Sequence, residues 1–210
     1  AAEELELVKF AFCIHQLSLE SLIDEYSHLF IGIGCLVGRE VQLHIDKTIQ
    51  PVALRHCRVA FHLRPKVEAE LRKLEAADII ERVEGPTPWV SPIVVTGKPK
   101  QPGEVRLCVD MRLPNLAIKR ERHPTPTVDD IVNEVAGSRW FSKMDLRSGY
   151  HQILLAPESR HVTMFSTHLG LRRYKRLNFG ISSAAEVFQD IIRGVLNGLE
   201  EIGRAAGRER

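Results

Sequence analysis

The stretch FSKMDLRSGYHQI, residues 141–153, constrains the fold of this chain more than any other. The run from Trp140 to Met144 is short and rich in aromatic residues, which is typical of a half-buried strand. Asp145 follows at the end of that strand, and Ser148-Gly149 then predicts an abrupt turn whose backbone N–H groups are free for an anion. A strand-end carboxylate beside free amides suits a metal-bound triphosphate, although a lone Asp in this position is more often a turn former.

Four further motifs surround this one in a fixed order. They are WVSPIVVTGKPK from Trp89, VRLCVDMRLPN from Val105, HPTPTVDDI from His123, and FSTHLGLRRYKRLNFGISSAAEVFQ from Phe165 to Gln189. The five blocks together closely resemble the fingers and palm of reverse transcriptases from gypsy-type LTR retrotransposons. The resemblance implies an α+β fold, a right-hand polymerase with fingers and a partial, ferredoxin-like palm.

Length and composition predict one domain with flanks, since 210 residues that are 44% hydrophobic can bury one sizeable core. We interpret residues 1–27 as a protease tail and linker, 28–64 as a lead-in segment, 65–199 as fingers and partial palm, and 200–210 as a non-native tail. The chain begins at Ala1 without a signal-peptide pattern, and its apolar runs are too short to span a bilayer. We therefore expect an intracellular, cytoplasmic fragment of a retrotransposon particle, with no membrane partner.

Charge is informative through its distribution, because the net value is only +2. Two basic clusters stand out: Arg172, Arg173, Lys175 and Arg176, and, upstream, Lys119, Arg120 and Arg122. Solvated faces are the simpler interpretation of both clusters. The resemblance instead favours contact with template, primer or triphosphate. The four cysteines are widely separated and form no C-x-x-C pair, so we assign no zinc site.

Hydrophobic periodicity predicts a helix over residues 18–30, a strand over 41–45, a helix over 66–84, and a hairpin of strands 93–96 and 105–109. Thr127 followed by Asp129 and Asp130 is typical of an N-cap with first-turn acids. A catalytic dyad is the weaker interpretation, because neighbouring residues on a helix point in different directions. The sequence Ser183-Ala184-Ala185-Glu186 fits a capping box at the start of a later helix.

The resemblance implies metal and nucleotide ligands in the central motif. Asp145 matches the first catalytic metal ligand of a two-ion site, and Leu146 would lend its backbone carbonyl to the second ion. Oxygen ligands suit Mg²⁺, with Mn²⁺ as a possible replacement. The amides near Ser148 and Gly149 would face the β- and γ-phosphates, and Tyr150 would pack against the sugar of the incoming dNTP.

The flanking motifs imply further contacts. Arg106 matches the fingers arginine that lies over the incoming base and reaches the phosphates, a role that suits a planar guanidinium. Either Lys98 or Lys100, at the hairpin tip, would grip the γ-phosphate, and the sequence leaves that choice open. Three residues match the motif that contacts template and primer: Phe179, Gly180 and Gln189. Asn178 stands where related polymerases often carry proline. Asp110 and Arg112 are expected to be scaffold residues, either paired with each other or supporting the palm.

The family's later motif of two adjacent aspartates has no counterpart here, since no Asp follows Asp190. We expect the intact parent to copy an RNA or DNA template from a primer with dNTPs, beside the protease, RNase H and integrase of a Pol polyprotein. The 210-residue chain itself is expected to be inactive. Two alternatives stay open, a non-catalytic nucleic-acid-binding remnant and a fragment with no autonomous fold.

Overall fold

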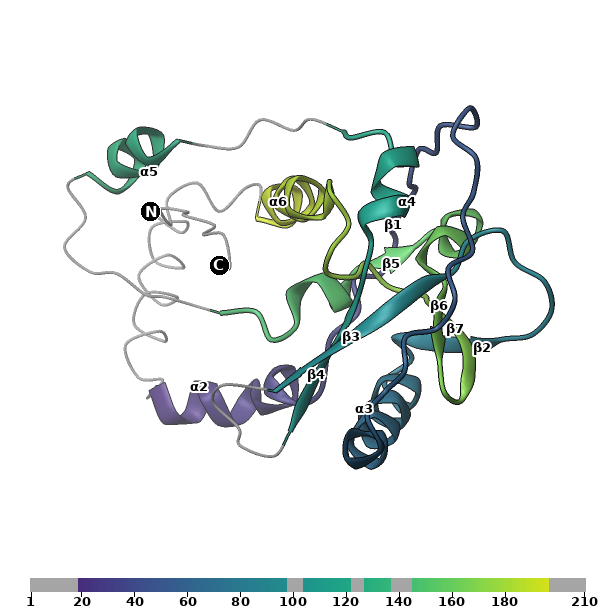
Figure 1. Ribbon diagram of the computed structural model, residues 1–210. Helices are drawn as coiled ribbons and strands as arrows, with labels where there is room; N and C mark the ends of the chain where they lie inside the picture. Colours follow the sequence, from purple (N-terminus) through teal and green to yellow (C-terminus); the bar gives the residue numbers. More distant parts are fainter. Residues whose placement is uncertain (1–18, 98–103, 122–126, 137–144, 197–210) are drawn as a thin grey trace, which may run out of the picture. The chain divides into compact units, whose positions relative to one another are not determined.

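The computed structural model describes residues 19–97, 104–121, 127–136 and 145–196 (Figure 1). The chain divides into two compact units, Ala1–Gly34 and Cys35–Arg210. The first unit contains α2 (Leu19–Glu25) and the 3-10 turn η1 (Ser27–Phe30). The helix predicted over residues 18–30 is therefore present but broken, because Tyr26 leaves helical backbone angles (φ −98°, ψ 14°).

A five-stranded mixed sheet organises the second unit, in the order β2-β7-β6-β3-β4. Its strands are β2 (Ile80–Val83), β3 (Ser91–Gly97), β4 (Val105–Val109), β6 (Phe165–Thr167) and β7 (Gly170–Tyr174). Strands β3 and β6 are parallel, and the other neighbours are antiparallel. The predicted β3–β4 hairpin is confirmed, with Ile93 opposite Val109 and Gly97 opposite Val105.

Helix α3 (Arg64–Ala76) packs against strands β2 and β4 and buries Val67, Leu71 and Leu74. The prediction of one helix over residues 66–84 is wrong in its second half. The helix ends after Ala76, the chain turns at Asp78 (φ 55°), and β2 follows. The β-branched pair Ile79-Ile80 continues the helical stripe in the sequence, yet Ile80 pairs with Tyr174 of β7, where β-branched side chains pack well.

A short parallel pair joins β1 (Glu40–Val41) to β5 (Leu154–Leu155). The strand expected over residues 41–45 is therefore shorter than predicted. The chain beyond β1 finds partners in other elements instead of one neighbouring strand. The N–H of Leu43, for example, donates to Oγ of Ser159 at 2.8 Å.

The remaining elements are helices and 3-10 turns. They are η2 (Phe61–Leu63), α4 (Arg112–Ala117), α5 (Val128–Val135), η3 (Gly149–Gln152), η4 (Pro157–Thr163) and α6 (Ala184–Val195). The cap predicted for α5 is confirmed. Oγ1 of Thr127 accepts from the N–H of Asp130 at 3.2 Å, and the Asp130 carboxylate accepts from the N–H of Thr127 at 2.7 Å. The Thr127 hydroxyl also lowers the pKa of Asp130.

The capping box predicted for α6 is wrong, although the helix is correct. Ser183 has φ −94° and ψ 0°, outside the extended range of a typical N-cap, and its side chain makes no capping bond. The Glu186 carboxylate instead accepts a hydrogen bond from Nε of Arg120 at 3.0 Å. An ion pair across the fold has displaced the local contact that the sequence suggested.

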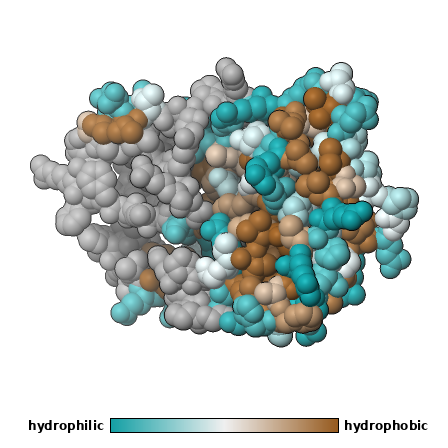
Figure 2. Space-filling view, in the orientation of Figure 1, coloured by the Kyte–Doolittle hydropathy of each residue, from teal (hydrophilic) through white to brown (hydrophobic). Residues whose placement is uncertain are grey.

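Apolar side chains remain on the surface of the described part of the chain, where Figure 2 shows them in patches among polar residues. Leu116 and Phe61 are each 68% exposed. Among the described residues, no helix is both long enough and apolar enough to cross a membrane.

Candidate active site

A tight turn follows Asp145 and forms the centre of the candidate site. Ser148 adopts a left-handed conformation (φ 51°, ψ 48°), and η3 begins at the next residue. The N–H of His151 donates to the Ser148 carbonyl at 2.9 Å. Asp145 and Leu146 lie exposed at the entrance to this turn. The turn predicted behind Asp145 is therefore confirmed, whereas the strand expected over residues 140–144 lies outside the described residues.

Gly149 is held in close contact with α6. It is buried, and a Cβ at this position would lie 2.9 Å from Cζ of Phe188. Real Cβ atoms do not come so near a packed ring, so a larger residue here must displace Phe188. The contact seats η3 on the helix that also carries Gln189.

Tyr150 lies in an aromatic cluster assembled from separate motifs. Its ring centroid is 4.7 Å from that of Phe179 and 5.2 Å from that of Phe188, the latter edge-on. The guanidinium carbon of Arg106, on β4, lies 5.1 Å from the centroid of Phe179. Tilted ring pairs and a cation over a ring are favourable arrangements. The fold thus brings Arg106, Tyr150 and Phe179 together.

His151 extends this cluster as a neutral ring. Its centroid lies 5.8 Å from that of Phe179 and 6.0 Å from that of Tyr174. Burial lowers the pKa of His151 from 6.5 to about 4, and the positive charges of Arg176 and Arg106 act in the same direction. The imidazole is therefore uncharged near pH 7 and contributes by packing.

The loop around Gly180 is held by α4. Gly180 has φ 97°, and a Cβ there would lie 3.2 Å from Cγ of Met111. Nδ2 of Asn115 donates to the Gly180 carbonyl at 2.7 Å, and its Oδ1 accepts from the N–H of Ser182 at 2.9 Å. Sequence reasoning missed Asn115 and Phe188. The only signal for Asn115 was its place in the VRLCVDMRLPN motif, and no local pattern shows which rings Phe188 meets.

Asn178 has a structural role. It is buried, and its Nδ2 donates to the carbonyl of Phe179 at 2.9 Å. Its Oδ1 has no hydrogen-bond partner among the described residues. This hydrogen bond from the Asn178 side chain restrains Phe179, whose ring belongs to the aromatic cluster.

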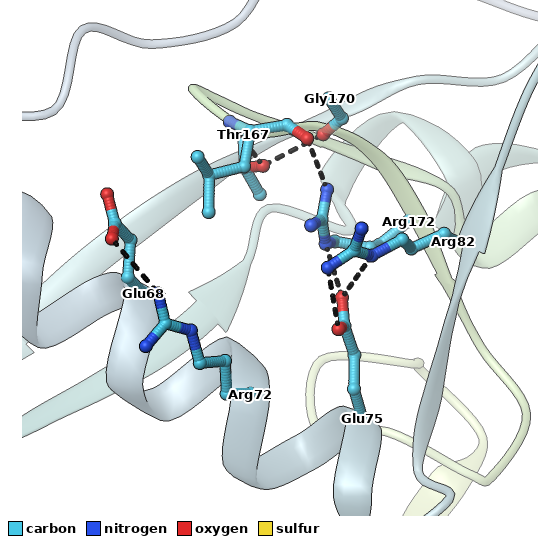
Figure 3. A network of polar contacts seen from close by, with 8 residues as sticks. Glu68, Arg72, Glu75, Arg82, Thr167, Gly170 and Arg172 are labelled. Atoms are coloured by element: carbon cyan, nitrogen blue, oxygen red, sulfur yellow. Dashed lines mark hydrogen bonds and ion pairs between the residues drawn. The ribbon is translucent and has the colours of Figure 1, made fainter.

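The basic cluster at residues 172–176 is paired within the fold, so the structure does not support its expected contact with nucleic acid or triphosphate. The ion pairs are Arg172 with Glu75 at 3.0 Å, Arg173 with Glu81 at 2.5 Å, and Lys175 with Asp78 at 2.5 Å. Arg172 is 2% exposed, and Figure 3 shows it converging with Arg82 on Glu75. These charges tie α3 and β2 to β7.

The second basic cluster is also engaged. Lys119 lies 3.7 Å from the Asp46 carboxylate, Arg120 pairs with Glu186, and Arg122 lies outside the described residues. Asp110 and Arg112 form the expected scaffold pair at 2.6 Å. The hydrogen bond from the Arg112 side chain lowers the pKa of Asp110.

The sequence predicts two metal ligands in this chain, the carboxylate of Asp145 and the backbone carbonyl of Leu146. In the parts of the chain that the structure describes, no three His, Cys, Asp or Glu side chains gather into a metal site. Lys98 and Lys100 lie outside the described residues, so the choice between them stays a prediction. The roles of the other site residues are predictions as well.

Comparisons with known proteins agree with this architecture. Residues 98–204 match the protein family described as reverse transcriptase (RNA-dependent DNA polymerase). The chain is 30% identical over 192 residues to the retrovirus-related Pol polyprotein from transposon 412 of Drosophila melanogaster, a match covering 87% of this chain and 15% of the polyprotein. It is 37% identical over 99 residues to the Pol polyprotein from transposon gypsy, also of Drosophila melanogaster, covering 47% of this chain and 9% of the polyprotein.

A solved structure shows the same fold. The foamy viral protease–reverse transcriptase in complex with an RNA/DNA hybrid superposes with a TM-score of 0.75 at 17% identity. The match covers 91% of this chain and 26% of the viral one. The chain therefore corresponds to a small part of each longer relative.

Proposed function

The chain belongs to the reverse transcriptase (RNA-dependent DNA polymerase) family, and from that premise we propose that it forms the fingers and part of the palm of a retrotransposon polymerase. The proposed reaction is template-directed nucleotidyl transfer. The primer 3′-hydroxyl attacks the α-phosphate of a dNTP, a phosphodiester bond forms, and pyrophosphate leaves. The substrates are a primed RNA or DNA template and dNTPs.

Asp145 and the Leu146 carbonyl are the proposed ligands of Mg²⁺. Both are exposed and both offer hard oxygen donors, which this ion prefers. Bound there, the ion would supply charge neutralisation for the triphosphate. One carboxylate and one carbonyl fill only part of an octahedral shell, and water, phosphate oxygens of the substrate or ligands outside the described residues would fill the rest.

Arg106 is proposed to bind the triphosphate. Its side chain is exposed, and among the described residues it forms no ion pair, unlike the arginines of β7. The contact with the Phe179 ring limits where the guanidinium can lie. A cation that is held in place but not neutralised is suited to bidentate contact with phosphate oxygens.

Tyr150 is proposed to exclude ribonucleotides. Its ring is packed between Phe179 and Phe188, only five residues after the metal-ligand candidate Asp145. A ring fixed on two sides cannot move aside for a 2′-hydroxyl. The observation that carries the proposal is an exposed carboxylate, five residues before a tyrosine whose ring packs on Phe179, together with the Arg106 guanidinium over that same Phe179 ring.

The direct test is Asp145→Asn in a chimera that continues the chain with the part of the transposon 412 polyprotein that follows the matched region. We expect incorporation of a single dNTP to fall by about 10²- to 10³-fold, because transition-state charge loses its stabilisation. Binding to primer–template should change little, since cationic side chains supply that affinity.

The matched control is Asp129→Asn, which alters an exposed acid in the first turn of α5 to which the proposal assigns no role. Incorporation by Asp145→Asn within about tenfold of the parent would contradict the assignment. A chimera that binds primer–template but never extends it would favour the alternative of a nucleic-acid-binding remnant.

A further inference from the structure

A concentration of positive charge leads into α3 and continues through its first turn, and the proposed chemistry assigns it no role. Residues 47–67 contain no Asp or Glu and carry five cations: Lys47, Arg55, Arg58, Arg64 and Lys66. Their formal charge exceeds the +2 of the whole chain. In contrast to the cluster at residues 172–176, none of the five forms an ion pair with another described residue.

An exposed aromatic ring lies among these cations. Phe61 opens η2 and is 68% exposed. The guanidinium carbon of Arg64 lies 4.1 Å from the ring centroid, and that of Arg58 lies 5.9 Å from it. We call Arg58, Phe61 and Arg64 the Phe61 patch, with Arg55 and Lys66 as its flanks.

The patch is fixed to the fold. Nε of Arg64 donates to the carbonyl of Val59 at 3.4 Å, and the Val59 side chain is buried. Arg64 is also the first residue of α3, whose buried stripe packs against the sheet. The Phe61 ring therefore lies on a segment that is anchored on one side by the buried Val59 side chain and on the other by α3.

Folding alone does not account for this arrangement. Burying a phenylalanine stabilises a fold, and an exposed cation–π contact recovers only part of that stabilisation. The first turn of α3 contains Arg64 and Lys66 and no acid, although cations are unfavourable at a helix N-terminus. Two features that each weaken the fold therefore meet at one exposed site.

We propose that the Phe61 patch binds single-stranded nucleic acid, with a base stacked on Phe61 and backbone phosphates held by Arg58, Arg64 and their flanks. Proteins that bind single strands commonly combine an aromatic platform with a basic track. Stacking needs an unpaired base, so the patch should distinguish a template overhang from blunt duplex. The identity of the ligand rests on the proposed polymerase function, but binding at the patch does not require the catalytic reaction.

The test measures binding of the 210-residue chain by fluorescence anisotropy to three labelled probes: blunt duplex, the same duplex with a 5′ template overhang, and oligothymidylate of about 12 nucleotides. The parent should bind the overhang at least about fivefold more tightly than blunt duplex. Phe61→Ala should remove about tenfold from binding to the overhang and oligothymidylate and less than about twofold from blunt duplex. Phe61→Trp should restore it.

Two further variants separate the ring from general effects. Leu116→Ala truncates another side chain that is 68% exposed, and it should leave all three affinities unchanged. Arg58→Gln should weaken every probe and reduce the salt dependence of binding by about one counterion.

Three results would overturn the inference. The first is equal affinity of the parent for blunt and overhanging duplex. The second is an equal loss of affinity for those two duplexes in Phe61→Ala, and the third is no loss of affinity for any probe in that variant. None of these depends on catalysis, so an active polymerase chimera without overhang preference would retain the proposed function and reject the patch.

Discussion

Tyr150 has aromatic neighbours at 4.7 Å and 5.2 Å, so its ring has little room to move away from an incoming sugar. In the chimera, Tyr150→Ala should raise incorporation of rNTP relative to dNTP by roughly 10- to 200-fold, the range expected when a steric barrier is removed from a binding pocket. Tyr150→Phe, which keeps the ring, should retain discrimination. Single-nucleotide extension with matched dNTP and rNTP measures the ratio. Unchanged selectivity in Tyr150→Ala would assign the residue to the core alone.

His151 makes the stability of the fold dependent on pH. Its pKa is about 4 in the folded chain against 6.5 unperturbed, so the unfolded chain binds more protons between these values. Stability should therefore fall as pH drops from 6.5 towards 4, by about 3 kcal/mol at most. His151→Gln should flatten this loss in urea unfolding at stepped pH. His62→Gln, at an exposed histidine, is the control for the substitution itself, and a slope in His151→Gln equal to that of the parent would refute the linkage.

At the level of single residues, the sequence motifs indicated which residues lie in the candidate site, but they did not indicate which residues those contact. The order of motifs singled out Arg106, Tyr150 and Phe179, and the fold brings them together. Phe188 and Asn115 were missed, because their partners lie far away in sequence. The ion pairs of the basic cluster at residues 172–176 were not predicted either, for the same reason. Glu75, Glu81 and Asp78, which pair with three of its members, lie on or beside α3 and β2.

At the level of elements, η3 and α6 are coupled through Gly149. Gly149→Ala places a Cβ 2.9 Å from the Phe188 ring, which Tyr150 also contacts, so we expect a loss of about 1–3 kcal/mol in the free energy of unfolding. Phe188→Leu in the same chain should recover part of it. Gly97→Ala is the control, since its Cβ would meet nothing within 4 Å. Urea denaturation measures the parent, the single variants Gly149→Ala and Phe188→Leu, the double variant and the control. Strictly additive losses would show that the two positions are not in contact.

Predictions of where elements begin and end were wrong where a local sequence signal competed with pairing between residues far apart in sequence. The helical stripe through Ile79-Ile80 gave way to pairing of β2 with β7. The S-x-x-E pattern at Ser183 gave way to the Arg120–Glu186 ion pair. The Thr127 cap and the β3–β4 hairpin were predicted correctly because both depend on residues that are close in sequence.

At the scale of the whole molecule, residues 36–46 act as a strap across the second unit. The N–H of Leu36 donates to the carbonyl of Gln152, the last residue of η3, at 2.7 Å. The N–H of Asp46 donates to the carbonyl of Ala117 at the end of α4, also at 2.7 Å. Between these two contacts lies the β1–β5 pair. The strap therefore links the turn behind Asp145 to the helix that holds the Gly180 loop.

Two truncations should distinguish the strap from the unit that precedes it. A chain that begins at Cys35 keeps the second compact unit and should unfold at nearly the same urea concentration as residues 1–210. A chain that begins at Lys47 loses the buried side chains of Val41 and Leu43, and each contributes about 1.5–3 kcal/mol. It should therefore unfold at a lower urea concentration and lose near-UV circular dichroism from the aromatic cluster around Tyr150. If both truncated chains unfold at the same urea concentration, the strap does not hold the candidate site. The sheet and α6 would then be sufficient to fix the turn behind Asp145.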